Sequence, residues 1–296
     1  MKQFMYTVLL ILIVCTARHA IAQGPPKGLH RKQVMSLSAG YRRLFRSDLD
    51  EISGDYALGI SSVKFSYMRF LSRKTNLGAS LSMEHSGYDF SSSTDPGFND
   101  VISTKMSMIW GQRINRRISL LTTAFISESA EPNADLSTAF TFGGMTGFQY
   151  AISKKISLGL AIAGRTRLEG HPRVLPFPLI KVRFTDRLSL LTRRGIGLSW
   201  IPDRKKQWKL DFFAGFENRM FRLDEDSTCP DGAVEDRRVD VRFQADYRPV
   251  PWIYVRALTG VSVYQKFSYY ASNGDEKGDL HSHPGLWLGM EAGIYF

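Results

Sequence analysis

The sequence has few cysteines and no long apolar segment. Two cysteines in 296 residues cannot build a disulfide framework or a four-cysteine zinc site. The longest apolar run, Met5 to Cys15, has eleven residues, whereas a helix needs about 20 to cross a bilayer. A membrane protein built of transmembrane helices is therefore excluded. With 43% hydrophobic and 12% aromatic residues, the chain is also too apolar to be mostly disordered.

The first 22 residues have the layout of a secretory signal peptide. Lys2 supplies the positive start, Met5 to Cys15 the apolar centre, and Ala20-Ile21-Ala22 the small-residue cleavage site. We therefore expect the protein to be exported and the signal peptide to be removed. Cys229 would then be the only cysteine, which excludes a disulfide within the mature chain.

A period of two in polarity runs through the rest of the chain. In the segment 239–248 every odd-numbered residue is apolar and every even-numbered residue is polar or charged. In the segments 77–84, 156–163, 208–217 and 286–296 every second residue is likewise apolar, and most residues between are small, polar or charged. This period is typical of β-strands whose two faces meet different media.

Strand length and the nature of the connections favour a membrane barrel over a soluble sandwich. Several predicted strands reach ten residues or more, close to the ~9–11 needed to cross a tilted barrel wall. Short basic connections, with twelve Lys/Arg and two Asp/Glu, alternate with mostly longer acidic ones, with seven Lys/Arg and twenty Asp/Glu. The short set is 72–75, 111–117, 153–155, 185–187, 202–206 and 248–251; the other set is 43–55, 86–100, 128–136, 166–173, 192–195, 224–236 and 267–284. Barrels of the bacterial outer membrane have short periplasmic turns and longer outer loops.

These observations predict an all-β fold, a transmembrane up-and-down antiparallel β-barrel of fourteen strands in the bacterial outer membrane. The strands are expected near 31–42, 56–70, 76–85, 101–110, 118–127, 137–151, 156–165, 174–184, 188–191, 196–201, 207–223, 237–247, 252–266 and 285–296. If the two short strands, 188–191 and 196–201, are only a hairpin extension, the number is twelve. The predicted organisation is a signal peptide over 1–22, a mobile lead-in over 23–30 and the barrel over 31–296. A soluble secreted sandwich is the alternative fold.

Two stretches carry a resemblance to known proteins. The carboxyl end, Gly289 to Phe296, looks like the terminal signal that the outer-membrane barrel-insertion machinery reads, with Ile294 and Phe296 in the apolar positions and Glu291 where a glycine is usual. The stretch that begins Leu175-Pro-Phe-Pro-Leu-Ile, with the later Gly197-Leu-Ser-Trp and Gly215-Phe-Glu-Asn-Arg, resembles an uncharacterised family of predicted outer-membrane barrels of Gram-negative bacteria. The resemblance implies the same fold and location and no activity.

Charged residues on the polar faces of the predicted strands form a set that must avoid lipid. A charge facing lipid at mid-depth costs roughly 2–4 kcal/mol, so these side chains must meet water or each other. The predicted lumen-lining residues are Lys105, Arg165, Lys181, Arg183, Asp211, Glu217, Arg219, Asp240, Arg242, Asp246, Arg256 and Glu291, joined by Lys64 and Lys209. They either pair across the lumen and plug it or line a wet path with a cationic bias.

The leading functional prediction is passive passage of small polar or anionic solutes through the lumen. The alternatives are a structural or interaction barrel that works through its acidic surface loops, and a lipid-modifying enzyme. The expected partners are outer-membrane lipid, the insertion machinery that would read Phe296, and a small polar solute. Nucleic acid is not expected, because the net charge of +11 is not gathered into a basic stripe with interleaved aromatics.

The sequence contains no motif that establishes catalysis, so we predict no enzyme, no catalytic residue, no metal and no cofactor. His85-Ser86 offers a base beside a nucleophile, and His281 and His283 are spaced to share one face of a strand. Ordinary rim and loop histidines are the preferred interpretation. The acidic residues within 224–236 could attract calcium, but they lack the spacing of a calcium loop.

Overall fold

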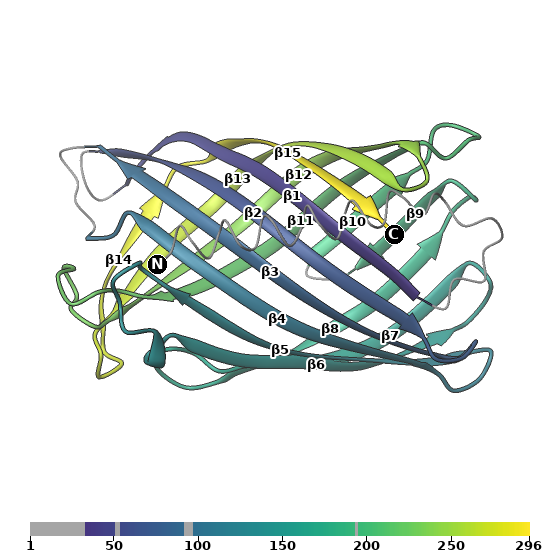
Figure 1. Cartoon of the computed structure of the whole chain (residues 1–296), viewed down its shortest axis with the longest axis horizontal. Helices are drawn as coiled ribbons and strands as arrows, with labels where there is room; N and C mark the ends of the chain where they lie inside the picture. The colour runs from purple at the N-terminus through teal and green to yellow at the C-terminus, as the bar shows by residue number, and fades with distance from the viewer. Residues whose placement is uncertain (1–32, 51–53, 92–96, 193–194) are drawn as a thin grey trace.

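A computed structural model describes residues 33–50, 54–91, 97–192 and 195–296, so the predicted signal peptide and lead-in lie outside the described residues. The chain forms one closed antiparallel sheet in which β15 returns to β1, as Figure 1 shows with the barrel axis horizontal. Fourteen strands build the wall, which confirms the predicted barrel. β14 and β15 follow one another along the same edge of β13, and β14 also bonds to the end of β1, so the two form one wall strand interrupted at 283–284. The strands are β1 (Gln33–Asp48), β2 (Asp55–Phe70), β3 (Thr75–Phe90), β4 (Asp100–Arg113), β5 (Ile118–Ala130), β6 (Phe140–Ala151), β7 (Ile156–Arg165), β8 (Arg173–Arg183), β9 (Leu188–Thr192), β10 (Gly195–Trp200), β11 (Trp208–Arg222), β12 (Ala233–Val250), β13 (Ile253–Tyr270), β14 (Glu276–Ser282) and β15 (Gly285–Tyr295).

Several strands continue beyond the lengths expected from the sequence. β1, β3, β5 and β13 do so at the end that carries the longer connections, β4 at the opposite end and β12 at both. The segment 267–284 was expected to be a loop, but β13 runs to Tyr270 and β14 pairs back on it as a hairpin. β12 likewise begins at Ala233, inside the expected loop 224–236. A single turn of 3-10 helix, η1 (Leu136–Thr138), lies in the β5–β6 connection. We call this end of the barrel the loop end and the opposite end, with the short connections, the turn end.

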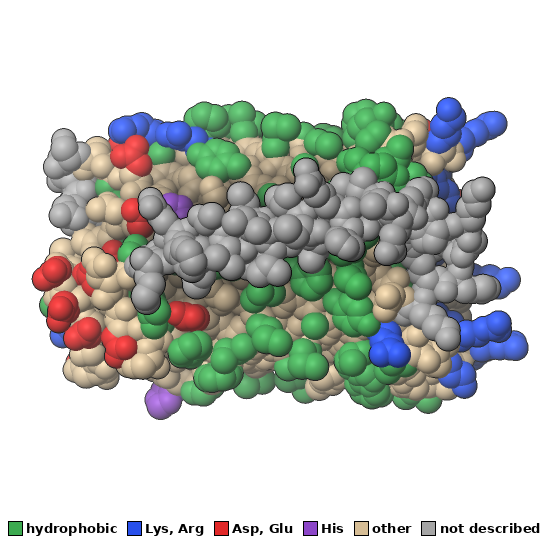
Figure 2. Space-filling model, viewed as in Figure 1, with side chains coloured by type: hydrophobic (Ala, Val, Ile, Leu, Met, Phe, Trp, Pro, Cys, Tyr) green, Lys and Arg blue, Asp and Glu red, His purple; other side chains and the backbone are tan. Residues whose placement is uncertain are grey.

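The outer face of the wall is apolar between two polar ends. Large side chains that alternate along the strands are exposed on it: Phe65, Leu81, Met106, Phe148, Leu160, Phe212, Phe243 and Met290. Figure 2 shows hydrophobic side chains over the middle of the barrel, acidic ones gathered at one end and basic ones at the other. This is the belt that a barrel wall presents to lipid. Within the described residues no helix is long and apolar enough to cross a membrane.

The wall is not uniform around its circumference, because β9 and β10 are short. β8 pairs with β9 only over Lys181–Arg183, and β10 covers only the residues of β11 up to Gly215. Toward the loop end the two flanking sections approach each other directly, since Arg222 of β11 pairs with Ala130 of β5. At this height the strands β6 to β10 are absent from the wall between β5 and β11. The part of β8 before Lys181 has no neighbouring strand on the side that faces β9.

Proline and threonine residues satisfy that unpaired edge of β8. The N–H of Ile180 donates to Thr192 Oγ1 over 2.8 Å, which shows that the even-numbered backbone groups of β8 face β9. The next two even positions are Pro176 and Pro178, which have no N–H to leave unpaired. Thr192 also donates to the carbonyl oxygen of Pro178 over 2.7 Å. The Pro-Phe-Pro stretch is thus suited to an edge inside a membrane wall.

Candidate functional site: the barrel lumen

The loop-end half of the lumen is filled by an apolar cluster, which we call the plug. Phe98, from the β3–β4 connection, is 1% exposed, and its ring centroid lies 5.1 Å from those of Tyr88 and Phe221. Tyr56 packs edge-on against Phe267 at 5.5 Å. The buried members of the plug lie on or next to β1 to β4 and β11 to β15: Leu44, Leu49, Tyr56, Leu58, Ile60, Tyr88, Phe98, Val101, Phe221, Leu223, Val234, Phe267, Leu280 and Trp287. Rings from opposite parts of the wall thus meet inside the lumen, as Tyr88 of β3 does with Phe221 of β11 and Phe267 of β13.

A network of charged side chains, which we call the ion-pair layer, lies against the plug. Arg238 is fully buried, with its guanidinium 3.5 Å from Asp236 and 3.3 Å from Glu217. Glu217 also faces Arg242 at 2.9 Å and, from across the lumen, Arg42 at 3.6 Å. The members are four arginines and four carboxylates, which balance in charge: Arg42, Arg219, Arg238, Arg242, Glu84, Glu217, Asp236 and Asp240.

Two of these arginines also stack on Trp287 of β15. The guanidinium carbons of Arg42 and Arg238 lie 5.7 and 5.1 Å from the centre of its ring. A cation over a desolvated indole is worth about 2 kcal/mol or more. Trp287 therefore joins the plug to the ion-pair layer, and the two form one packed unit.

Nearer the turn end the inward charges form smaller groups. Arg256 joins Asp246 at 2.7 Å and Glu291 at 2.9 Å, and Tyr254 donates to Glu291 over 2.5 Å. Lys209 pairs with Asp211, two residues along the same strand. Apart from Asp246, which is 4% exposed, these charged side chains are partly exposed, unlike Arg238 and Asp236 at the centre of the ion-pair layer.

Small polar residues and two lysines line β2 to β5 on the inward face of this turn-end half. Ser80 and Ser107 share a hydrogen bond of 2.7 Å across β3 and β4. The ammonium of Lys105 lies 4.1 Å from the centre of the Phe125 ring, and Lys64 is exposed. Lys181 and Arg183 are exposed near the turn end of β8.

Arg165, which the sequence analysis placed among the lumen-lining residues, contacts the backbone of β11. Its guanidinium donates to the backbone carbonyl of Asn218 over 3.1 Å, on the edge of β11 that β10 leaves uncovered. Two neighbouring arginines, Arg167 and Arg173, lie 2.9 and 2.8 Å from Glu235 of β12. These contacts join the β7–β8 hairpin to β11 and β12 where β9 and β10 are missing from the wall.

Four members of the ion-pair layer are absent from the predicted set of lumen-lining residues: Arg42, Glu84, Asp236 and Arg238. Asp236 and Arg238 continue the even-numbered polar face of the segment 239–248, so extending that pattern toward the amino end finds both. Glu84 lies on the polar face of its strand by the same alternation. Arg42 falls where its strand was expected to end, and the sequence offers no signal for it.

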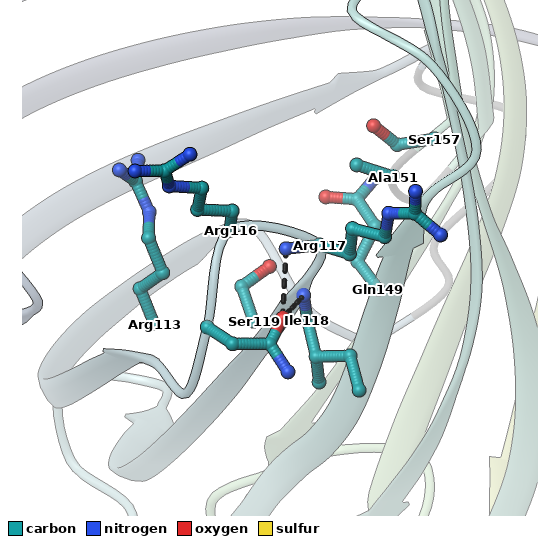
Figure 3. A pocket seen from close by; sticks show the side chains of 9 residues that line it. Arg113, Arg116, Arg117, Ile118, Ser119, Gln149, Ala151 and Ser157 are labelled. Atoms are coloured by element: carbon teal, nitrogen blue, oxygen red, sulfur yellow. Dashed lines mark hydrogen bonds between the residues drawn. The ribbon is translucent and has the colours of Figure 1, made fainter.

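A hollow of about 250 Å³ at the turn end is lined by three arginines (Figure 3). Arg113 and Arg116 lie on one side of it and Arg117 on the other, while the side-chain oxygen of Asn115 accepts from the backbone N–H groups of Arg117 and Ile118. No acidic residue lines it. The charged side chains that line the hollow are therefore all cationic.

The histidine and serine side chains that the sequence analysis considered as catalytic or metal-binding residues do not form a common site in the structure. Ser86 is 2% exposed and accepts from Arg219 inside the barrel, so it points away from His85. His85 instead lies 3.0 Å from Asp100, and His283 lies 2.7 Å from Asp50. His281 pairs in register with Lys266 on the β13–β14 hairpin.

The acidic stretch 224–236 is not a single cluster. Glu235 binds arginines on one face of β12, whereas Asp236 points into the lumen from the other. The arginine contacts leave these carboxylates no role as joint calcium ligands. Across the described parts of the chain, no group of three or more His, Cys, Asp or Glu side chains is arranged to hold a metal ion.

Comparison with solved structures gives the same fold. A mutant of the monoaromatic hydrocarbon channel TodX is 9% identical, with 92% of this chain and 91% of that chain covered and a TM-score of 0.50. The Pseudomonas putida toluene transporter TodX is 11% identical over 92% and 91% of the two chains, with a TM-score of 0.46. The outer-membrane protease OmpT of Escherichia coli is 12% identical over 91% and 99%, with a TM-score of 0.26.

At such low sequence identity, structural similarity to the TodX channel mutant establishes the fold alone and does not indicate the activity of this chain. The chain has the closed antiparallel β-barrel fold of this channel. No protein-family model matches the sequence, and no curated protein matches it either. The resemblance to an uncharacterised barrel family therefore stays a prediction.

Proposed function

We propose that this outer-membrane barrel is closed along its axis and acts through the surfaces that it presents, above all the acidic loop end. The observation that carries the proposal is the plug, which is packed like a protein core where a channel needs space. Beneath it, Arg238 and Asp236 are both fully buried. An open aqueous path at this height would leave such groups solvated.

The acidic surface of the loop end supports an interaction role. Exposed carboxylates of the β1–β2, β3, β11–β12 and β13–β14 segments gather there, including Asp50, Asp89, Glu225 and Asp275. A surface of one charge sign steers partners of the opposite sign and disfavours acidic ones. The partner expected from this chemistry is a basic protein or peptide.

Single-channel recording in planar bilayers tests the closed axis. Folded protein, verified by its heat-dependent shift on gels, is expected to give no conductance steps. Phe98→Ala removes the central ring of the plug and is the informative variant; Phe65→Ala, which removes a ring from the lipid-facing side, is its control. Stable steps from the unaltered protein would contradict the proposal.

Passage of small polar or anionic solutes remains the second candidate. The lining of the turn-end half supports it, because Ser80, Ser107, Lys64 and Lys105 offer hydroxyl and ammonium groups to a hydrated anion. This function requires the plug to move. Its signature is conductance that appears in Phe98→Ala, favours anions and falls when Lys105 is replaced by Met.

A further inference from the structure

Three polar residues interrupt the apolar outer face of the wall on consecutive strands. They are Ser61 of β2, His85 of β3 and Asp100 of β4. Alternation places each on the outward side of its strand, which it shares with exposed apolar residues: Phe65, Leu81 and Met106. The three lie outside the lumen, so nothing about them depends on whether the barrel is closed.

His85 and Asp100 form a hydrogen-bonded pair on this face. His85 Nε2 lies 3.0 Å from Asp100 Oδ1, and the two side chains are 51% and 52% exposed. A carboxylate in this position orients an imidazole and stabilises its protonated form. The pair leaves Nδ1 of His85 as the nitrogen that can take a proton from another group.

Ser61 is the hydroxyl that the sheet register brings to His85. The two residues are directly opposite each other on β2 and β3, and the Cβ atoms of such pairs lie about 4.5–5.5 Å apart. Rotation about the Cα–Cβ bond of Ser61 is enough to bring its hydroxyl to the imidazole. Ser86, next to His85 in the chain, faces the lumen and is buried, so it cannot take this role.

A phenol side chain lies on the side of Ser61 that faces away from His85. Tyr41 of β1 is directly opposite Ser61, faces outward and is 50% exposed. Its ring extends over β2 toward Gly59: a Cβ atom added at Gly59 would lie 3.1 Å from the phenol oxygen. The absence of a side chain at Gly59 makes room for this O–H, which can donate to a developing oxyanion near Ser61.

The depth of these residues indicates what they would meet. Toward the turn end the outward positions of the same strands are apolar, as at Val63 and Met83, and toward the loop end they turn polar with Asp89. Ser61 and His85 lie at this boundary of the lipid belt. The ester bonds of membrane lipids lie between the acyl chains and the polar headgroups, which is the same level.

We propose that Ser61, His85 and Asp100 are a catalytic triad that hydrolyses acyl esters of membrane lipids in the outer leaflet. The Ser61 oxygen attacks the ester carbonyl carbon while His85 takes the hydroxyl proton, and Tyr41 donates to the carbonyl oxygen as it becomes an oxyanion. The C–O bond to the alcohol breaks, and His85 protonates the departing alcohol. Water, deprotonated by His85, then attacks the acyl-serine, which releases the fatty acid and returns the proton to Ser61.

Two measurements on the folded full-length barrel test the triad. The first is labelling by a fluorophosphonate probe, with the modified residue located by mass spectrometry. The second is fatty-acid release from mixed micelles that contain a phospholipid with a fluorescent acyl chain. Labelling at Ser61 and steady release are expected from the unaltered protein.

The variants separate catalysis from structure. Ser61→Ala and His85→Ala are each expected to lower the release rate at least about 10³-fold, and Asp100→Asn at least about 100-fold. The matched control is His283→Ala, which removes the imidazole of the other His–Asp pair, His283 with Asp50, away from Ser61, and is expected to leave the rate unchanged. All variants must keep the heat-dependent gel shift of the folded barrel. Folded unaltered protein that neither labels at Ser61 nor releases fatty acid would overturn the proposal, as would equal rates in Ser61→Ala.

Discussion

The two halves of the lumen share β1 to β5 and β11 to β13 but are filled by different means. Toward the loop end, aromatic rings and the fully buried pair of Arg238 and Asp236 pack as in a soluble protein core. Toward the turn end, side chains such as Lys64, Ser80 and Arg256 keep contact with solvent. The wall alone does not determine the interior of a barrel; the side chains that face inward do.

The difference has an energetic consequence. In the loop-end half Arg238 and Asp236 are cut off from water and depend on their partners, so the removal of one leaves the other buried and uncompensated. In the turn-end half water can replace a lost partner. Substitutions should therefore cost much more stability in the first half than in the second.

Arg238→Ala is expected to have the largest effect. It leaves Asp236, which is fully buried, without its guanidinium, and the free energy of unfolding should fall by about 3–5 kcal/mol. Urea unfolding in phospholipid vesicles, followed by tryptophan fluorescence, measures the change. A loss below about 1 kcal/mol would mean that water reaches Asp236 and that the ion-pair layer is not sealed.

Phe98→Ala should follow, with a loss of about 3 kcal/mol from the cavity that it leaves among Tyr88, Phe90 and Phe221. The same urea titration applies. Phe65→Ala is the control, because its ring faces lipid and is 40% exposed, and its effect should be smaller. Equal effects of the two variants would show that the plug is loosely packed.

Arg256→Ala tests the other half with the same chemical change as Arg238→Ala. Arg256 is 26% exposed and binds Glu291, which is equally exposed, and Asp246, which is 4% exposed but also accepts from the Gln244 side chain over 2.9 Å. The expected loss is about 1–2 kcal/mol, the value of hydrogen bonds to charged groups when solvent can compensate. If Arg256→Ala destabilises the barrel as much as Arg238→Ala, the contrast between the halves is wrong.

Ser80→Ala is expected to have the smallest effect, below about 1 kcal/mol. It removes one hydroxyl from the 2.7 Å hydrogen bond with Ser107, and water can satisfy the remaining one. The double variant Ser80→Ala with Ser107→Ala should match the single variant within error. A much larger loss would indicate that the turn-end half is dry.

Much of the wall could be predicted from the sequence. Alternation is a local property, and it located the strands, the number of wall strands and even the two short ones, 188–191 and 196–201, which became β9 and β10. The hairpin β13–β14 was not foreseen, since 267–284 combines turn residues with no clean alternation. β14 can pair there only because β13 continues to Tyr270, beyond the strand end at 266 that the sequence predicts.

The lumen was predictable only in part. Residues such as Glu217, Arg242 and Asp240 were recognised by their place on a polar face, and they meet in the ion-pair layer. The plug was not recognised, because inward positions near the loop end, such as Leu58 and Ile60, are apolar. Near the loop end polarity no longer distinguishes the outward face of a strand from its inward face. Alternation therefore does not show which residues fill the lumen there.

The sequence by itself determined the barrel, because a strand between lipid and an enclosed interior must alternate in polarity along its own length. Only the tertiary structure decided what the interior contains. Closure of the sheet brings Arg42 of β1 to Glu217 of β11 and Tyr88 of β3 to Phe267 of β13, and contacts between such distant segments leave no trace in any local pattern. The same holds for the outer face, where the register of β2, β3 and β4 alone brings Ser61, His85 and Asp100 together.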